Sequence, residues 1–415
     1  MTAPSLSLDS VVEMQPLHIG EEVDGAVEVG RPDTGVFVSL PVEGATVVRW
    51  LVERRPLAEI SRCFLERYGV ELDVPDFVRD LSGCGFVRRI DDRELAETTQ
   101  GDRPAPSGWR VLGNLPQSSV GWLLSKPAYG CYAAIWAAAA VLLITRSELR
   151  PSAGRAYQNI GVLGNLALLT VLGWLLVLLH ELAHLAATRA RGCSGSLDIS
   201  YRLHLLVAQT DISSVRTLPH SQRYAPYLAG MTCDVTMLLG CCLLQLAGVP
   251  SGVPRALTYL LAMSLLFQLA LFVRTDLYYV MTNALRLGNL MGDTRRWMAN
   301  LVSRALGAAP RHDLSDIPAR ELRFVRWYAM VVVLGVAVVV SQFLLLGLPL
   351  LVKFIENSAA GLRAGPLTAG FWNGVALLLI VVTHFLLLGI AILRERRRVT
   401  ARSATAAAGM ALAEG

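Results

Sequence analysis

The sequence contains few charged residues for its length. Asp, Glu, Lys and Arg account for 17% of the 415 residues, whereas hydrophobic residues account for 53%. A soluble domain usually carries about 25% charged residues, so this composition excludes an ordinary soluble enzyme. It indicates instead a chain that lies largely within a lipid bilayer.

Several other chemistries lack their usual sequence marks. None of the seven cysteines forms a Cys-x-x-Cys pair, so neither a disulfide framework nor a zinc finger is expected. No segment matches GxxxxGK[ST], which excludes a nucleotide site of the P-loop type. The first 120 residues contain no apolar run of the signal-peptide kind, so no cleavable signal is expected.

Six apolar segments are long enough to cross a bilayer, because about 20 apolar residues span its hydrocarbon core. The third segment carries Gly230 and Asp234, so it is either a plain span or a broken, re-entrant one. We therefore expect a polytopic α-helical membrane protein with six transmembrane helices, centred on 128–145, 161–187, 226–248, 256–275, 328–350 and 370–393.

Arginine placement predicts the orientation of these spans. The loops after the second and fourth spans and the segment after the sixth are rich in arginine, whereas the other loops hold few. Cytoplasmic loops carry the excess of basic residues, so both termini are predicted to be cytoplasmic in a multi-pass protein of the cell membrane. The net charge of +5 then reflects arginines beside anionic lipid headgroups and gives no case for nucleic acid.

The second apolar segment contains the motif His180-Glu181-Leu182-Ala183-His184. On a helix over about 161–190, His180 and His184 lie on one face and can hold one Zn²⁺, with Glu181 beside them as general base. These side chains are costly to place in so apolar a stretch unless they face a cavity, a partner or a metal. The alternative is a pair of histidines satisfied by neighbouring helices or headgroups.

A catalytic zinc site usually has three protein ligands, so another carboxylate or histidine is expected at the same depth. Asp276 and Asp234 are the candidates. His180 and Asp276 both lie about 20 residues from the outer ends of their predicted spans, or roughly 30 Å at about 1.5 Å per residue. Depth therefore favours Asp276 as the third ligand, whereas Asp234 is expected to orient a histidine. The alternative for Asp276 is an ion pair with Arg274.

A separate α+β domain is predicted before the first span. Residues 26–29 and 35–40 have the pattern of two strands, 44–53, 57–68 and 75–83 that of short amphipathic helices, and 85–90 that of a closing strand. This order predicts a small winged-helix domain within 1–95. A linker over 96–126, a membrane domain over 127–398 and a disordered, Ala-rich tail over 399–415 are expected to follow.

The N-terminal segment, with GATVVRWLVE and VPDFVRDLSGCGFV, resembles the PqqD-like peptide-recognition element of ribosomal peptide pathways. The resemblance implies that a leader peptide binds as an extra strand beside the hairpin. A DNA-binding winged helix is the alternative, but Asp76, Arg79 and Asp80 stand on the third helix in place of a basic face. No nucleic-acid partner is expected.

The membrane domain resembles site-2-type intramembrane zinc metalloproteases, through the His180–His184 motif and the segment around Asp276. Leu277 stands where that family has a glycine after the aspartate. The whole arrangement is similar to membrane metalloproteases of modified-peptide, daptide-like biosynthesis. The resemblance implies a zinc metalloendopeptidase that removes the leader of a ribosomally made precursor near the cytoplasmic membrane face.

Two other functions stay open. One is a regulatory site-2-type protease that cuts a transmembrane signalling protein, which a tolerated deletion of residues 1–95 would favour. The other is a non-enzymatic peptide export or immunity protein, which activity surviving Glu181→Gln would favour, since only hydrolysis needs the base.

The loop after the motif helix has the alternation of a strand over residues 199–208. A strand beside the zinc would hold a substrate in extended form, as peptide hydrolysis requires. The alternative is a hairpin that only covers the mouth of the site.

Overall fold

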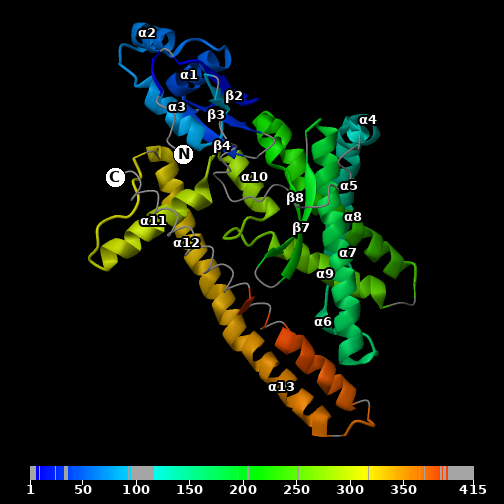
Figure 1. Cartoon of the computed structure of the whole chain (residues 1–415). Coiled ribbons are helices and arrows are strands. Elements are labelled where there is room, and N and C mark those ends of the chain that lie inside the picture. The colour runs from blue at the N-terminus through cyan, green and yellow to red at the C-terminus, as the bar shows by residue number, and fades with distance from the viewer. Residues whose placement is uncertain are drawn as a thin grey trace.

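The computed structural model describes residues 6–390, with gaps at 9, 24, 32–35, 92, 95–115, 194, 203–204, 250–251, 316, 364, 369, 384–385 and 387–388. The described residues form a small N-terminal domain of strands and short helices and a larger, mainly helical part (Figure 1). Most of the predicted linker, the end of the sixth predicted span and the tail over 399–415 lie outside the described residues.

The N-terminal domain has helices and strands where the sequence predicts them, with further strands in addition. Its strands form two antiparallel three-stranded sheets, ordered β1-β5-β6 and β2-β3-β4. The sequence did not predict β2, whose HIGEEV segment lacks the alternation of a half-buried strand. The elements are β1 (Val12–Met14), β2 (His18–Val23), β3 (Ala26–Arg31), β4 (Val36–Pro41), α1 (Val42–Val52), α2 (Leu57–Tyr68), α3 (Val74–Gly83), β5 (Val87–Ile90) and β6 (Arg93–Glu94).

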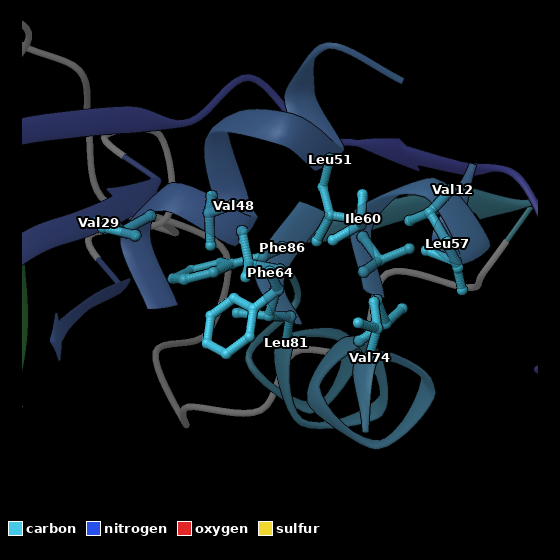
Figure 2. Close-up of a cluster of buried hydrophobic side chains, with 14 of the residues drawn as sticks. Val12, Val29, Val48, Leu51, Leu57, Ile60, Phe64, Val74, Leu81 and Phe86 are labelled. Carbon is cyan, nitrogen blue, oxygen red and sulfur yellow. The ribbon is translucent and has the colours of Figure 1, made fainter. Parts of the chain in front are cut away.

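One hydrophobic core joins the three helices of this domain to its strands. Val48 and Leu51 of α1, Ile60 of α2 and Phe86 before β5 are fully buried and lie together (Figure 2). Full burial of one such side chain contributes about 1.5–3 kcal/mol. This core is separate from the clusters of the helical part, so the domain has its own hydrophobic centre.

Four helices among the described residues are long and apolar enough to cross a membrane. They are α5 (Lys126–Thr145), α7 (Gly161–Ala190), α8 (His220–Leu246) and a 45-residue helix, Ala319–Arg363. This last helix comprises α12 (Ala319–Gln342), one π-helical turn over Phe343–Gly347 and α13 (Leu348–Arg363). It projects away from the other long helices (Figure 1). The six expected spans are thus not all present as long helices: the sixth expected segment contains a shorter helix, Gly370–Thr383.

The fourth predicted span is wrong in its extent. The helix there, α9 (Val253–Phe267), has 15 residues and ends well before 275. Residues 268–275 form turns and irregular backbone, and α10 (Asp276–Ala284) begins a new helix. Hydrogen bonds within the break compensate for the lost helical ones, because Thr275 Oγ1 donates to the Gln268 carbonyl over 3.0 Å. Irregular backbone at membrane depth is stable only where its polar groups find such partners.

The segment between α7 and α8 contains a β-hairpin. β7 (Ser196–Arg202) and β8 (Leu205–Asp211) pair antiparallel from Ser196 with Asp211 to Arg202 with Leu205. The predicted strand over 199–208 is therefore two strands, and their connection at 203–204 lies outside the described residues. The remaining short elements are α4 (Gln117–Val120), η1 (Gly121–Leu124), η2 (Ser147–Leu149), α6 (Ala153–Ala156), η3 (Ser213–Thr217) and α11 (Leu290–Ala305).

The N-terminal domain docks on the chain that leads from β8 into α8. Glu28 of β3 forms ion pairs with Arg216 of η3 and with Arg223 of α8, the latter at 3.5 Å. The Arg216 guanidinium also stacks over Phe37 of β4, 5.3 Å from the ring centroid. The sheet β2-β3-β4 thus contacts the first turn of a helix that contributes to the metal centre.

We predict that Glu28→Arg loosens this docking, because it replaces attraction to two arginines with repulsion. Partly exposed ion pairs contribute about 0.2–1 kcal/mol each, so the loss of two should raise amide hydrogen exchange over β2–β4 about twofold to thirtyfold. Glu13→Arg is the matched control, since Glu13 pairs with Arg54 and Arg89 inside the domain. Adding Arg216→Glu to Glu28→Arg should restore part of the protection. Equal exchange in Glu28→Arg and the wild type would contradict the docking contact.

Candidate metal centre

The two histidines of α7 meet one carboxylate at a single point. His180 Nε2 lies 3.0 Å from Asp276 Oδ2, and His184 Nε2 lies 3.2 Å from the same oxygen. The two Nε2 atoms are 3.2 Å apart. One ligand atom from each residue lies within 4.8 Å of the others, so the three side chains can together hold a metal ion. His184 is buried, and Asp276 is partly exposed.

Asp276 reaches this point by a route that the depth argument did not foresee. It is the first residue of α10, and Thr275 caps that helix by accepting a hydrogen bond from the Tyr278 amide at 3.3 Å. The amide of Asp276 itself donates to Gln268 Oε1 over 2.9 Å. A helix start after a chain break, rather than a helix continued to residue 275, therefore positions the carboxylate.

The second ring nitrogen of each histidine has its own partner. His180 Nδ1 lies 3.0 Å from Asp234 Oδ2, and His184 Nδ1 donates to the Pro226 carbonyl at 2.7 Å. A carbonyl oxygen can only accept, so His184 carries its proton on Nδ1 and presents Nε2 as a free ligand when neutral. In metal sites, the second ring nitrogen of a ligating histidine usually binds a carboxylate or a carbonyl oxygen. Both imidazoles have such a partner here.

Asp234 does not share the point at which the three ligand atoms meet. Its carboxylate is 1% exposed, contacts the far side of the His180 ring and accepts a hydrogen bond from Ser264 Oγ at 2.8 Å. This placement fits the orienting role expected for Asp234 better than the role of third ligand. Asp234 and Asp276 both form ion pairs with these histidines, so a divalent cation would balance the charge of the two carboxylates.

Gly230 of α8 leaves open the space in front of the two histidines. A Cβ atom at this position would lie 2.3 Å from His180 Nε2 and 2.4 Å from His184 Nε2. Contacts this short are impossible for carbon, so any larger residue would push the rings out of place or fill the space between the ligand atoms. The glycine that suggested a broken helix lies instead inside a continuous one, where it allows close approach.

The carboxylate of Glu181 is held by the hairpin. Its Oε2 accepts a hydrogen bond from the Thr210 amide at 2.7 Å, and Thr210 Oγ1 donates to the Glu181 carbonyl at 2.9 Å. Thr210 stands opposite Leu197 in the hairpin, and Leu197 packs on Leu185 of α7. The amide of Thr210 is thus on the edge of β8 that faces away from β7. That edge faces the motif residue Glu181.

Sequence reasoning did not single out three residues that contact this centre: Thr210, Ser264 and Gln268. Two of them had a usable signal. Ser264 and Gln268 are the polar side chains in the otherwise apolar stretch 260–273, four residues apart, and polar residues inside a membrane segment are commonly functional. Thr210 had no such signal, because its contact depends on how the hairpin folds back on α7.

Comparison of the chain with protein-family models, with curated proteins and with solved structures finds no match.

We predict that Gly230→Ala lowers metal affinity at least about tenfold, because the added methyl group competes for the space between the ligand atoms. Gly240→Ala is the matched control on the same helix, since nothing lies within 4 Å of its added Cβ. Both changes favour helix by up to about 1 kcal/mol, so loss of metal without loss of folding is expected only for Gly230→Ala. Titration of the purified protein with zinc against a chromophoric chelator measures this. Equal affinities for the two variants would mean that the metal does not occupy this space.

Proposed function

We propose that this protein is an intramembrane zinc metalloprotease. The observation that carries the proposal is the convergence of His180, His184 and Asp276 on one point, with Glu181 adjacent in the same motif. Two imidazoles and one carboxylate form a donor set typical of catalytic zinc, which usually keeps its fourth position for water or substrate. The ligand residues come from α7, which is apolar enough to cross a membrane, and from the start of α10.

Each residue then has a defined task in peptide hydrolysis. Bound zinc would supply Lewis acidity toward the scissile carbonyl and toward a water molecule. Glu181 accepts a proton from the attacking water as the new carbon–oxygen bond forms. The same carboxyl group gives that proton to the amide nitrogen as the carbon–nitrogen bond breaks, so the products are a carboxylic acid and an amine, which ionise to a carboxylate and an ammonium group. Asp234 and the Pro226 carbonyl keep the histidine rings oriented throughout.

The substrate in this proposal is a ribosomally made precursor whose leader binds the N-terminal domain. The docking of that domain supports delivery to the site: Glu28 pairs with Arg223, and three residues further along α8 the Pro226 carbonyl binds His184. The edge of β8 that faces away from β7 would hold the cleavage region extended, since a helical peptide hides its scissile carbonyl. Cleavage would occur near the cytoplasmic membrane face, with both termini cytoplasmic, as arginine placement predicts.

We predict that Glu181→Gln abolishes cleavage while leaving metal binding intact. The amide cannot take up the water proton, so a loss of at least about a hundredfold is expected. Mass spectrometry of a leader-bearing precursor co-expressed with each protein is the measurement, and Glu356→Gln, at an exposed site on α13, is the control. The wild type and the control should release one discrete product that the Glu181→Gln sample lacks. An intact precursor that co-purifies with the wild type would point to transport or immunity instead.

Removal of residues 1–95 distinguishes the two kinds of protease. If the N-terminal domain captures the leader, the truncated protein should retain zinc but cleave the precursor at least about tenfold more slowly at low substrate concentration, because the leader no longer raises local concentration. Undiminished cleavage of a single-pass membrane protein by the truncated form would favour the regulatory site-2 type. Zinc content and cleavage rate of both forms are the measurements.

A further inference from the structure

Two polar side chains at the C-terminal end of α9 contact the two acidic residues of the metal centre, one at a carboxylate and the other at a backbone amide. Ser264 and Gln268 are four residues apart, which places them on the same side of a helix and its first continuing turn. Ser264 Oγ donates to Asp234 Oδ2 at 2.8 Å, and Gln268 Oε1 accepts from the Asp276 amide at 2.9 Å. Both residues are far from the His180–His184 motif in sequence, so tertiary packing and not local structure brings them to the metal centre.

Gln268 holds the start of α10 at two points. Its side-chain oxygen binds the amide of Asp276, and its carbonyl accepts from Thr275 Oγ1 at 3.0 Å. The side chain is 7% exposed, so these hydrogen bonds replace hydrogen bonds with water. Burying an amide without partners costs about 1–3 kcal/mol, and an apolar residue would serve better if packing were the only need.

Ser264 acts on the opposite side of the centre. Its hydroxyl donates to the carboxylate that contacts His180 Nδ1, and that carboxylate is 1% exposed. With this donor in place, the chain Ser264, Asp234, His180 fixes the plane of the imidazole. Without it, the Asp234 carboxylate would lose its hydrogen bond from Ser264 and keep its contact with His180.

We infer that Ser264 and Gln268 are positioning residues for metal binding: Gln268 sets the location of Asp276, and Ser264 sets the orientation of His180 through Asp234. Neither touches the point where the metal would lie. α9 therefore determines the distance between two ligands that arrive from different helices. This inference rests on the metal site proposed above and extends it to residues outside the ligand set.

The test is the affinity of the full-length purified protein for zinc alone, measured by competition with a chromophoric chelator. Gln268→Leu keeps the size of the side chain and removes the acceptor, and should weaken zinc binding about tenfold to a hundredfold. Gln268→Glu keeps an oxygen acceptor and should stay within about threefold of the wild type. Ser264→Ala should weaken binding about tenfold, because Asp234 then holds His180 less firmly.

Matched controls separate positioning from a loss of general stability. Gln245→Leu removes a part-buried glutamine of α8 that donates to Thr258 Oγ1 at 2.9 Å, away from the metal centre. Thr258→Ala is the equivalent control for Ser264→Ala on α9. Both controls should bind zinc like the wild type. Thermal melting without metal should fall similarly in Gln268→Leu and Gln245→Leu, whereas the rise in melting temperature caused by zinc should shrink only in Gln268→Leu.

Saturation with Co²⁺ gives a measurement that a general loss of stability would not change. The visible absorption bands of bound Co²⁺ report ligand geometry, so they should shift in Ser264→Ala and Gln268→Leu and match the wild type in both controls. If Gln268→Leu does not fold, the comparison of Ser264→Ala with Thr258→Ala decides.

The two proposals fail in different ways. A wild type that binds no zinc would overturn the proposed protease, and the positioning roles with it. A wild type that binds zinc, together with Gln268→Leu and Ser264→Ala variants that bind it equally well and show the same Co²⁺ spectrum, would overturn only the positioning roles.

Discussion

Two imidazoles and two carboxylates share a small volume among apolar helices, and the compensation of their charges constrains everything around them. Each carboxylate would be costly there alone. Each contacts a histidine instead, and α8 comes close enough for this because Gly230 has no side chain. The arrangement of α7, α8, α9 and α10 brings Asp276 to both imidazole rings and Asp234 to the far side of the His180 ring. A bound divalent cation would complete that balance, which is why we place the chemistry here.

The spacing of residues in the sequence predicted the part of the site that lies on one helix. His180 and His184 share a face because four residues make about one helical turn, and the structure has α7 over the predicted range. Asp276 was expected beside them at the inner end of the fourth predicted span. In the structure, the helix of that span ends at Phe267. The three side chains do meet, but through the break after α9. That break depends on hydrogen bonds between Gln268, Thr275 and Asp276, which no hydropathy pattern records.

In the N-terminal domain, too, the helices could be predicted from the sequence, whereas a contact between distant residues could not. Its helices follow from amphipathic spacing, and Gly69, with φ of 69°, ends α2 in the left-handed conformation that glycine favours. The attachment through Glu28 to Arg216 and Arg223 joins residues about 190 positions apart, and such a contact cannot be read from composition. It brings the domain to the chain that links the hairpin with α8. The docked domain therefore contacts the chain between Thr210, which binds Glu181, and Pro226, which binds His184.

The shortness of α9 has a consequence for the surrounding lipid. Fifteen residues rise about 22 Å at roughly 1.5 Å per residue, less than the ~30 Å of hydrocarbon in a typical bilayer. In the proposed intramembrane protease, acyl chains beside α9 would compress to match it, or headgroups and solvent would follow the irregular segment after Phe267 inward. Either adjustment brings the aqueous phase toward Asp276 from the side. Under the proposed function, the water consumed in hydrolysis would then reach the site where the bilayer is thinned, without a channel through the protein.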